Sequence, residues 1–148
     1  MRLSEPEATR LLDAHDHGVL STVHPRRGVD AVPVVYTAGQ PVGLVGIPVD
    51  RVKQKASGLL QRERNLREDP RASLLVEHWD RADWNALWWV RAELRLEARP
   101  DAGRDAILSD RLAKRFDQYR AAPFDRILVL RVVTVTGWAA DSRPRGVW

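Results

Sequence analysis

Cationic side chains gather in one short stretch of the sequence, VKQKASGLLQRERN at positions 52–65. Four cations stand there against the single acid Glu63, and they are Lys53, Lys55, Arg62 and Arg64. The two lysines are two positions apart, so in an extended chain they point the same way. A strand end, a loop and a helix start can together bind an anion, because free backbone N–H groups and side-chain cations reach one point. The same pattern also suits a solvated loop and helix face, and the segment alone leaves both interpretations open.

Several other kinds of site are excluded by what the sequence lacks. There are no cysteines, which excludes a disulfide framework, a cysteine nucleophile and thiolate metal sites. Neither glycine-rich phosphate-binding motif occurs, and the G-x-S-x-G motif of hydrolases is also missing. His15 and His17 flank Asp16, but histidines facing water at a helix end explain them better than a metal pair. His24 and His78 are expected to be structural or exposed. We therefore predict no metal site and assign no catalytic residue.

Six tryptophans in 148 residues are the second group that could do chemistry. Trp88 begins an alternation of apolar and charged residues, and Trp89 falls on its wet side. A tryptophan at a strand start can pack in the core or under a partner subunit. It can also stack on a flat conjugated ring, and both interpretations stay open.

The elements that position these groups can be read from periodicity and turn residues. A first helix is expected over SEPEATRLLDAHDHG, with Ser4 and Glu7 at capping-box spacing and Gly18 as its stop. A later helix places Leu108, Leu112, Phe116 and Tyr119 on one side. The TAGQP segment is expected to be a turn. Six strands are expected, over residues 18–23, 29–36, 42–47, 72–79, 88–99 and 126–139.

The strand from Trp88 has the clearest pattern, with one apolar and one charged face over more than ten residues. Arginine and glutamate alternate on the charged face, which argues against a nucleic-acid-binding ribbon. Six strands with short connections favour an antiparallel sheet closed into a barrel, with helices packed outside. We expect a mainly β (α+β) fold in a single domain covering residues 1–148.

Composition fits a globular protein, with 44% hydrophobic and 30% charged residues. The start of the chain has no apolar region typical of a secretory signal, and no apolar run is long enough to span a membrane. We therefore expect a cytoplasmic protein. The formal net charge of +4 suggests an anionic ligand or nucleic acid, although acidic residues are interleaved with the arginines.

The sequence resembles the split β-barrel flavin and deazaflavin oxidoreductases of the pyridoxamine 5′-phosphate oxidase-like superfamily, in particular the branch that uses coenzyme F420. The resemblance runs along nearly the whole chain. It is carried by GVLSTV, AVPVVY, VDRVKQK, LLQRERNLREDPRASLLVEHW, DWNALWWVRAE, RFDQYRAAPF and VTVTGWAA. It implies a six-stranded antiparallel split β-barrel with flanking helices. It also implies a homodimer with cofactor sites at the subunit interface.

The resemblance also implies which residues bind the cofactor. Lys53 and Lys55 match positions that hold the phosphate-bearing tail, and Arg62 and Asn65 match the helix start that completes that pocket. The strand bearing Val34 and Val35 would run beside the ring, and Trp88 would lie near the ring or the dimer contact. The ASGLLQ segment lengthens the loop before the helix relative to the shortest relatives.

From this resemblance we expect an oxidoreductase that transfers a hydride between F420 and a small organic substrate. Four cations suit the several charges of the F420 arm better than the single phosphate of FMN. The chain also lacks the complete arginine set of pyridoxamine-phosphate oxidases. FMN-dependent oxidoreduction is the alternative, and a non-catalytic cofactor- or tetrapyrrole-binding protein is another. Neither nucleic acid nor membrane is expected as a partner.

Overall fold

The computed structural model describes residues 1–50, 58–121 and 124–142. The helices among them are α1 (Glu5–Ala14), α2 (Gln61–Glu68), the short 3₁₀ helix η1 (Trp84–Ala86), α3 (Ala102–Arg115) and α4 (Asp117–Ala121). The strands are β1 (His17–His24), β2 (Gly28–Val35), β3 (Thr37–Ala38), β4 (Leu44–Val49), β5 (Arg71–His78), β6 (Trp88–Leu96) and β7 (Arg126–Ala139). Among the described residues, no helix combines the length and the apolar character that crossing a membrane requires.

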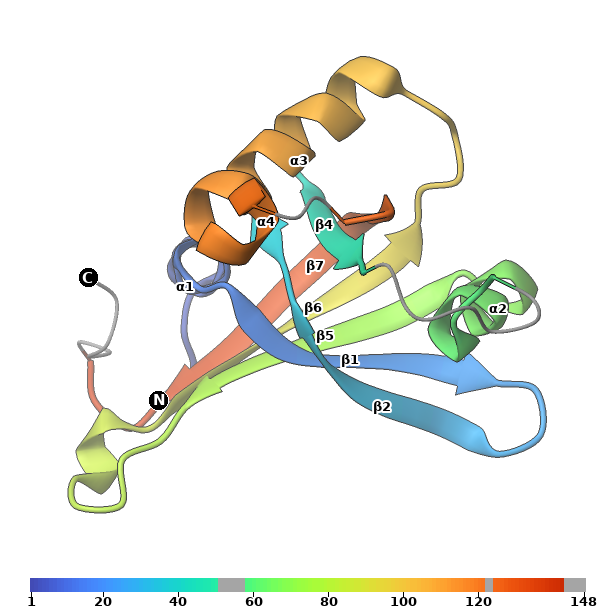
Figure 1. Cartoon of the computed structure of the whole chain (residues 1–148). Coiled ribbons are helices and arrows are strands. Elements are labelled where there is room, and N and C mark those ends of the chain that lie inside the picture. The colour runs from blue at the N-terminus through green and yellow to red at the C-terminus, as the bar shows by residue number, and fades with distance from the viewer. Residues whose placement is uncertain (51–57, 122–123, 143–148) are drawn as a thin grey trace.

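The strands form one antiparallel sheet in the order β2-β1-β5-β6-β7-β4-β3. The two edge strands, β2 and β3, follow each other along the chain with only Tyr36 between them. The sheet must therefore curl until its edges approach, and Figure 1 shows this curled sheet with helices around it. Tyr36 is fully buried, and its hydroxyl donates to the carbonyl of Leu12 in α1 at 2.6 Å.

The mainly β, α+β architecture is confirmed, but the number of strands is seven rather than six. The additional strand is β3, in the TAGQP segment that the sequence had indicated as a turn. Its two residues pair with Val45 and Gly46 of β4. Two residues are too few to produce an alternation of apolar and polar positions, so the sequence carries no signal for this strand.

Helix α1 begins as predicted but ends earlier. Ser4 donates to the carboxylate of Glu7 from its backbone nitrogen at 2.9 Å and from its hydroxyl at 2.6 Å. The helix ends at Ala14, and Gly18 lies in β1 rather than at the helix terminus. A Cβ at Gly18 would stand 2.5 Å from the carbonyl oxygen of Leu75. The glycine is therefore needed for close strand packing, not for stopping a helix.

The predicted helix through Tyr119 is divided in two. Leu108 and Leu112 are buried as expected, but α3 ends at Arg115 and α4 starts at Asp117. The Arg115 guanidinium donates to the carbonyls of His15 at 2.6 Å and Asp13 at 2.7 Å. These bonds tie the end of α3 to the end of α1, and Tyr119 is carried away from the apolar side of α3.

The predicted alternation is confirmed from Trp88 to Leu94, but the strand ends at Leu96 rather than at residue 99, and Ala98 is exposed. Trp88, Val90, Ala92 and Leu94 are fully buried, and Arg91 on the other face is exposed. These residues belong to one core, which also contains the apolar side of α1 and inward residues of the other long strands. The core holds the sheet in its curled form and fixes the positions of the edge strands.

Candidate functional site

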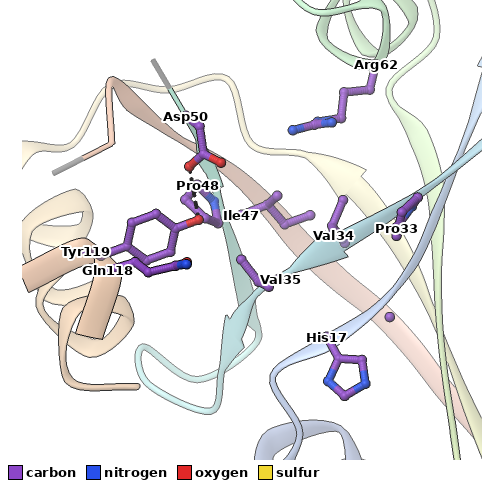
Figure 2. A pocket seen from close by; sticks show the side chains of 11 residues that line it. His17, Pro33, Val34, Val35, Ile47, Pro48, Asp50, Arg62, Gln118 and Tyr119 are labelled. Atoms are coloured by element: carbon purple, nitrogen blue, oxygen red, sulfur yellow. Dashed lines mark hydrogen bonds between the residues drawn. The ribbon is translucent and has the colours of Figure 1, made fainter. Parts of the chain in front are cut away.

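A cavity of about 370 Å³ lies between the two sheet edges, where β2 faces the second half of β4. Strand β3 pairs with β4 only through Val45 and Gly46, so it does not cover the rest of that strand. The cavity is within the ~300–1,000 Å³ range of small-molecule sites. Its lining residues, ten of them labelled in Figure 2, are His17, Gly18, Pro33, Val34, Val35, Ile47, Pro48, Asp50, Arg62, Gln118 and Tyr119.

Two prolines help to keep this gap open. Tyr36 donates its backbone N–H toward the segment that enters β1, and Val49 accepts a hydrogen bond from the residue before β7. Paired and outward positions alternate along a strand, so Pro33 in β2 and Pro48 in β4 turn their backbones toward the cavity. Proline has no N–H to donate. Neither edge therefore offers a regular row of donors, and the two edges do not join.

Arg62, the second residue of α2, extends toward the cavity (Figure 2). Its Nε atom is buried and has no hydrogen-bond partner among the described residues. Burial lowers the pKa of this guanidinium, and the nearby charges of Glu63 and Asp50 oppose that shift. Arginine nevertheless stays charged in proteins. A half-buried cation without a partner carries a desolvation cost, and an anionic ligand in the cavity would offset it.

Asp50 and Tyr119 contribute the other polar groups of the wall. Asp50 follows β4 directly, and the Tyr119 hydroxyl of α4 donates to its Oδ1 at 3.0 Å. Burial, together with the hydrogen bond to Asp50, raises the pKa of Tyr119 to about 12. The phenol therefore keeps its proton at neutral pH and directs it at the carboxylate.

The structure brings three of the predicted site residues together. Val34, Val35 and Arg62 line the same cavity, with the two valines on its apolar side. Lys53 and Lys55 lie outside the described residues. They belong to the segment between Asp50 and Arg62, and both of those flanking residues line the cavity. The participation of the lysines in cofactor binding stays a prediction.

Asn65 is held by hydrogen bonds within the fold. It is fully buried and does not line the cavity. Its side-chain nitrogen donates to Thr22 at 3.0 Å and to Asp30 at 2.9 Å, and its oxygen accepts from Gln61 at 2.9 Å. These bonds join α2 to β1 and β2. Asn65 is thus a link within the fold, and its participation in cofactor binding stays a prediction.

Trp88 is likewise a core residue. It is fully buried, with the ring of His15 edge-on at 4.6 Å and the ring of His78 stacked at 6.0 Å. It does not line the cavity. Of the two interpretations that the sequence left open for this tryptophan, the structure supports packing in the core.

Eight of the eleven residues that line the cavity were not found from the sequence, and four of these have polar side chains. These are His17, Asp50, Gln118 and Tyr119. The position of Asp50, directly after a strand and before the cationic segment, was an available signal. The approach of Tyr119 to Asp50 crosses 69 positions of the chain, and no local pattern indicates it.

No family model matches the sequence, and no curated protein matches it significantly. Solved structures do match. A FAD-binding protein from Mesorhizobium loti is 20% identical, with a TM-score of 0.68 over 93% of this chain and 93% of its own. A heme-binding protein from Mycobacterium smegmatis is 21% identical, with a TM-score of 0.67. That match covers 97% of this chain and 57% of the mycobacterial protein.

The heme storage protein HutZ from Vibrio cholerae is a more distant match, 14% identical with a TM-score of 0.58. The match covers 90% of this chain and 91% of HutZ. Similarity at this level of identity shows a shared fold. The chain shares the split β-barrel fold of these neighbours, which include a FAD-binding protein and heme-binding proteins.

Proposed function

We propose that the chain binds a flavin-type cofactor, a flavin or a deazaflavin, in the cavity between β2 and β4, and that it is an oxidoreductase. The observation that carries this proposal is Arg62, a cation whose buried Nε has no hydrogen-bond partner in the described part of the chain and which lines a cavity with both apolar and polar residues. The FAD-binding structural neighbours add support at the level of the fold.

The residues present fit such a group. Val34, Val35 and Ile47 give the cavity an apolar wall, against which a flat ring can lie. Outward backbone positions of β2 can meet the polar edge of that ring. A phosphate on the attached chain can accept from Arg62, and a charge-assisted hydrogen bond of this kind contributes about 1.5–3 kcal/mol.

Among the cofactors of this type we propose F420, with FMN as the alternative. The sequence resemblance favours F420, and the net charge of +4 suits its anionic arm. When bound, the cofactor supplies hydride transfer to or from a small organic substrate. The chain's own residues bind it, orient its ring and exclude water. We assign no proton donor.

We also propose that the protein is a homodimer. Val19 of β1 and Leu75 of β5 are cross-strand neighbours, and their exposed fractions are 39% and 40%. A second copy would cover these exposed apolar neighbours. Sedimentation velocity should show a dimer, and Leu75→Asp should shift it toward the monomer; a wild-type monomer at micromolar concentration would contradict this part of the proposal.

The binding proposal is tested by titrating the apo protein with F420, FMN and FAD while following tryptophan fluorescence. Saturable binding is expected, and Arg62→Ala should weaken it roughly 10- to 100-fold. Arg64→Ala is the matched control, since Arg64 lies on the same helix but donates to Leu59 and Gln61 and does not line the cavity. An equal effect of the two substitutions, or no binding at tens of micromolar, would contradict the proposal.

Heme binding without catalysis is a second candidate, favoured by one observation. His17 lines the cavity, and its Nδ1 lies 2.8 Å from Asp16 Oδ1. This arrangement leaves Nε2 for a metal, because ligating histidines commonly hydrogen-bond a carboxylate through their other nitrogen. A heme absorption band that His17→Ala abolishes, in a protein that binds neither flavin nor F420, would select this function instead.

A further inference from the structure

The polar groups of the cavity are divided by hydrogen-bonding type. Arg62 can only donate, and Asp50 as a carboxylate can only accept. Both line the cavity, and the charge of Asp50 acts on Arg62. No ion pair joins the two within the part of the chain that the structure describes. The carboxylate and the guanidinium are thus left to serve separate parts of a ligand.

The corner formed by Asp50 and Tyr119 accepts hydrogen bonds and does not donate them to a ligand. The Tyr119 hydroxyl commits its proton to Asp50 Oδ1, which leaves the lone pairs of the phenol oxygen as acceptors. The only hydrogen bond of the Asp50 side chain with the described residues is the one that its Oδ1 accepts from Tyr119. A ligand that fills this corner needs hydroxyl or amine donors. An anionic group of the ligand would be repelled there by the Asp50 carboxylate.

We propose that Asp50 and Tyr119 form a hydroxyl-binding subsite, so that the cavity selects a flat ring carrying a phosphorylated polyol chain. The inference rests on the proposed function and deepens it. The phosphate is bound at Arg62 and the hydroxyl groups of the chain donate to Asp50 and Tyr119. The two ends of one flexible chain are thereby recognised by groups of opposite charge.

Three related ligands separate these contributions. Lumiflavin has the ring alone, riboflavin adds the polyol chain, and FMN adds the phosphate. The dissociation constants of these three ligands and of their 5-deaza analogues are measured for the wild type. The two series together show whether the protein prefers the flavin or the deazaflavin ring. The variants are Asp50→Ala, Tyr119→Phe and Arg62→Ala. Asp110→Ala is the control, because Asp110 is an exposed carboxylate of α3 paired with Lys114 and outside this cavity.

In the wild type, riboflavin should bind roughly tenfold or more tightly than lumiflavin, since the added hydroxyls donate to a charged acceptor. Asp50→Ala should bring this ratio close to one and leave the FMN-to-riboflavin ratio unchanged or larger. Tyr119→Phe should lower the riboflavin-to-lumiflavin ratio partly. Arg62→Ala should remove only the gain from the phosphate, and Asp110→Ala should change neither ratio.

The outcomes distinguish this inference from the function on which it rests. If the ligands bind but the riboflavin-to-lumiflavin ratio is the same in Asp50→Ala and the wild type, the subsite is wrong and the cofactor proposal stands. If no ligand of either series binds the wild type, both are overturned. Circular dichroism and melting temperature identify any variant that fails to fold, and Tyr119→Phe then provides the same comparison with the ring retained.

Discussion

Neighbouring polar residues of α2 differ in whether their hydrogen bonds are satisfied. Glu63 accepts from Arg126 at 2.6 and 2.8 Å, and Asn65 is hydrogen-bonded to Thr22 and Asp30. Toward the cavity, the Nε of Arg62 is buried without a partner among the described residues. Buried polar groups in native proteins are normally satisfied. The satisfied residues of this helix therefore hold the fold, and under the proposed function the unsatisfied Nε of Arg62 is placed to bind the cofactor.

The largest expected effect tests whether Trp88, like Glu63 and Asn65, supports the fold. Trp88→Ala should lower the free energy of unfolding by about 3–5 kcal/mol, because it empties a fully buried site. Trp84, which is 68% exposed, provides the control. Trp84→Ala should change the free energy of unfolding by less than about 0.5 kcal/mol. Urea denaturation measures both. Similar losses in the two variants would contradict the assignment.

The ion pair of Glu63 should appear as a pH-dependent contribution to stability. Burial alone would raise the pKa of Glu63, but the hydrogen bonds and charge of Arg126 and the N–H of Leu60 outweigh it, and the pKa lies below its usual value. The stabilisation is thus present above about pH 4.5, the pKa of an unperturbed glutamate, and is lost as pH falls through the lower value in the folded state. Glu63→Gln should cost about 1.5–3 kcal/mol at pH 7.

This difference between the wild type and Glu63→Gln should shrink toward zero in acid, where Glu63 of the wild type is itself protonated. Urea unfolding at a series of pH values from neutral to acidic measures it. A difference that stays constant across the series would show that the charge of Glu63 contributes nothing.

Removal of the Asn65 side chain should have a somewhat smaller effect. Asn65→Ala breaks the bonds to Thr22, Asp30 and Gln61 and should cost about 1–3 kcal/mol of stability. Glu68→Ala, at the exposed end of the same helix, should cost far less. Cofactor affinity corrected for the folded fraction should not change in Asn65→Ala. A specific loss of affinity would return Asn65 to the binding site that its motif suggested.

The smallest expected effect on stability is at Arg62. Arg62→Leu should leave the free energy of unfolding within about 0.5 kcal/mol of the wild type, or raise it, since it removes a partly desolvated cation whose Nε bonds to none of the described residues. Thermal and urea unfolding without ligand measure this. A clear loss of stability would mean that Arg62 supports the fold, and the contrast with its satisfied neighbours Glu63 and Asn65 would disappear.

Much of the fold could be predicted because strong periodicity and capping patterns are local. The alternation from Trp88 indicated both the strand and its buried face, and Ser4 with Glu7 marked the start of α1. The strand β3 and the break after Arg115 could not be found this way. A two-residue strand has no period, and the break depends on carbonyls of α1, about one hundred positions away.

The candidate site was less accessible from the sequence. Arg62 and Asn65 belong to one motif and were assigned one role, yet three positions along a helix separate a residue of the cavity from one locked in the fold. Only the distant partners Thr22 and Asp30 make that distinction. Asp50 and Tyr119 acquire their relation through the tertiary structure alone.

The open gap between β2 and β4 has a mechanical consequence. A molecule bound there would contact β2 and β4 at once and so join two strands that are not paired with each other. Each increase in its concentration should raise the melting temperature, with a gain of about 2.7 kcal/mol when the free ligand is at one hundred times its dissociation constant. Amide hydrogen exchange should slow most in the two strands on either side. The barrel would then be most rigid when the cavity holds its ligand.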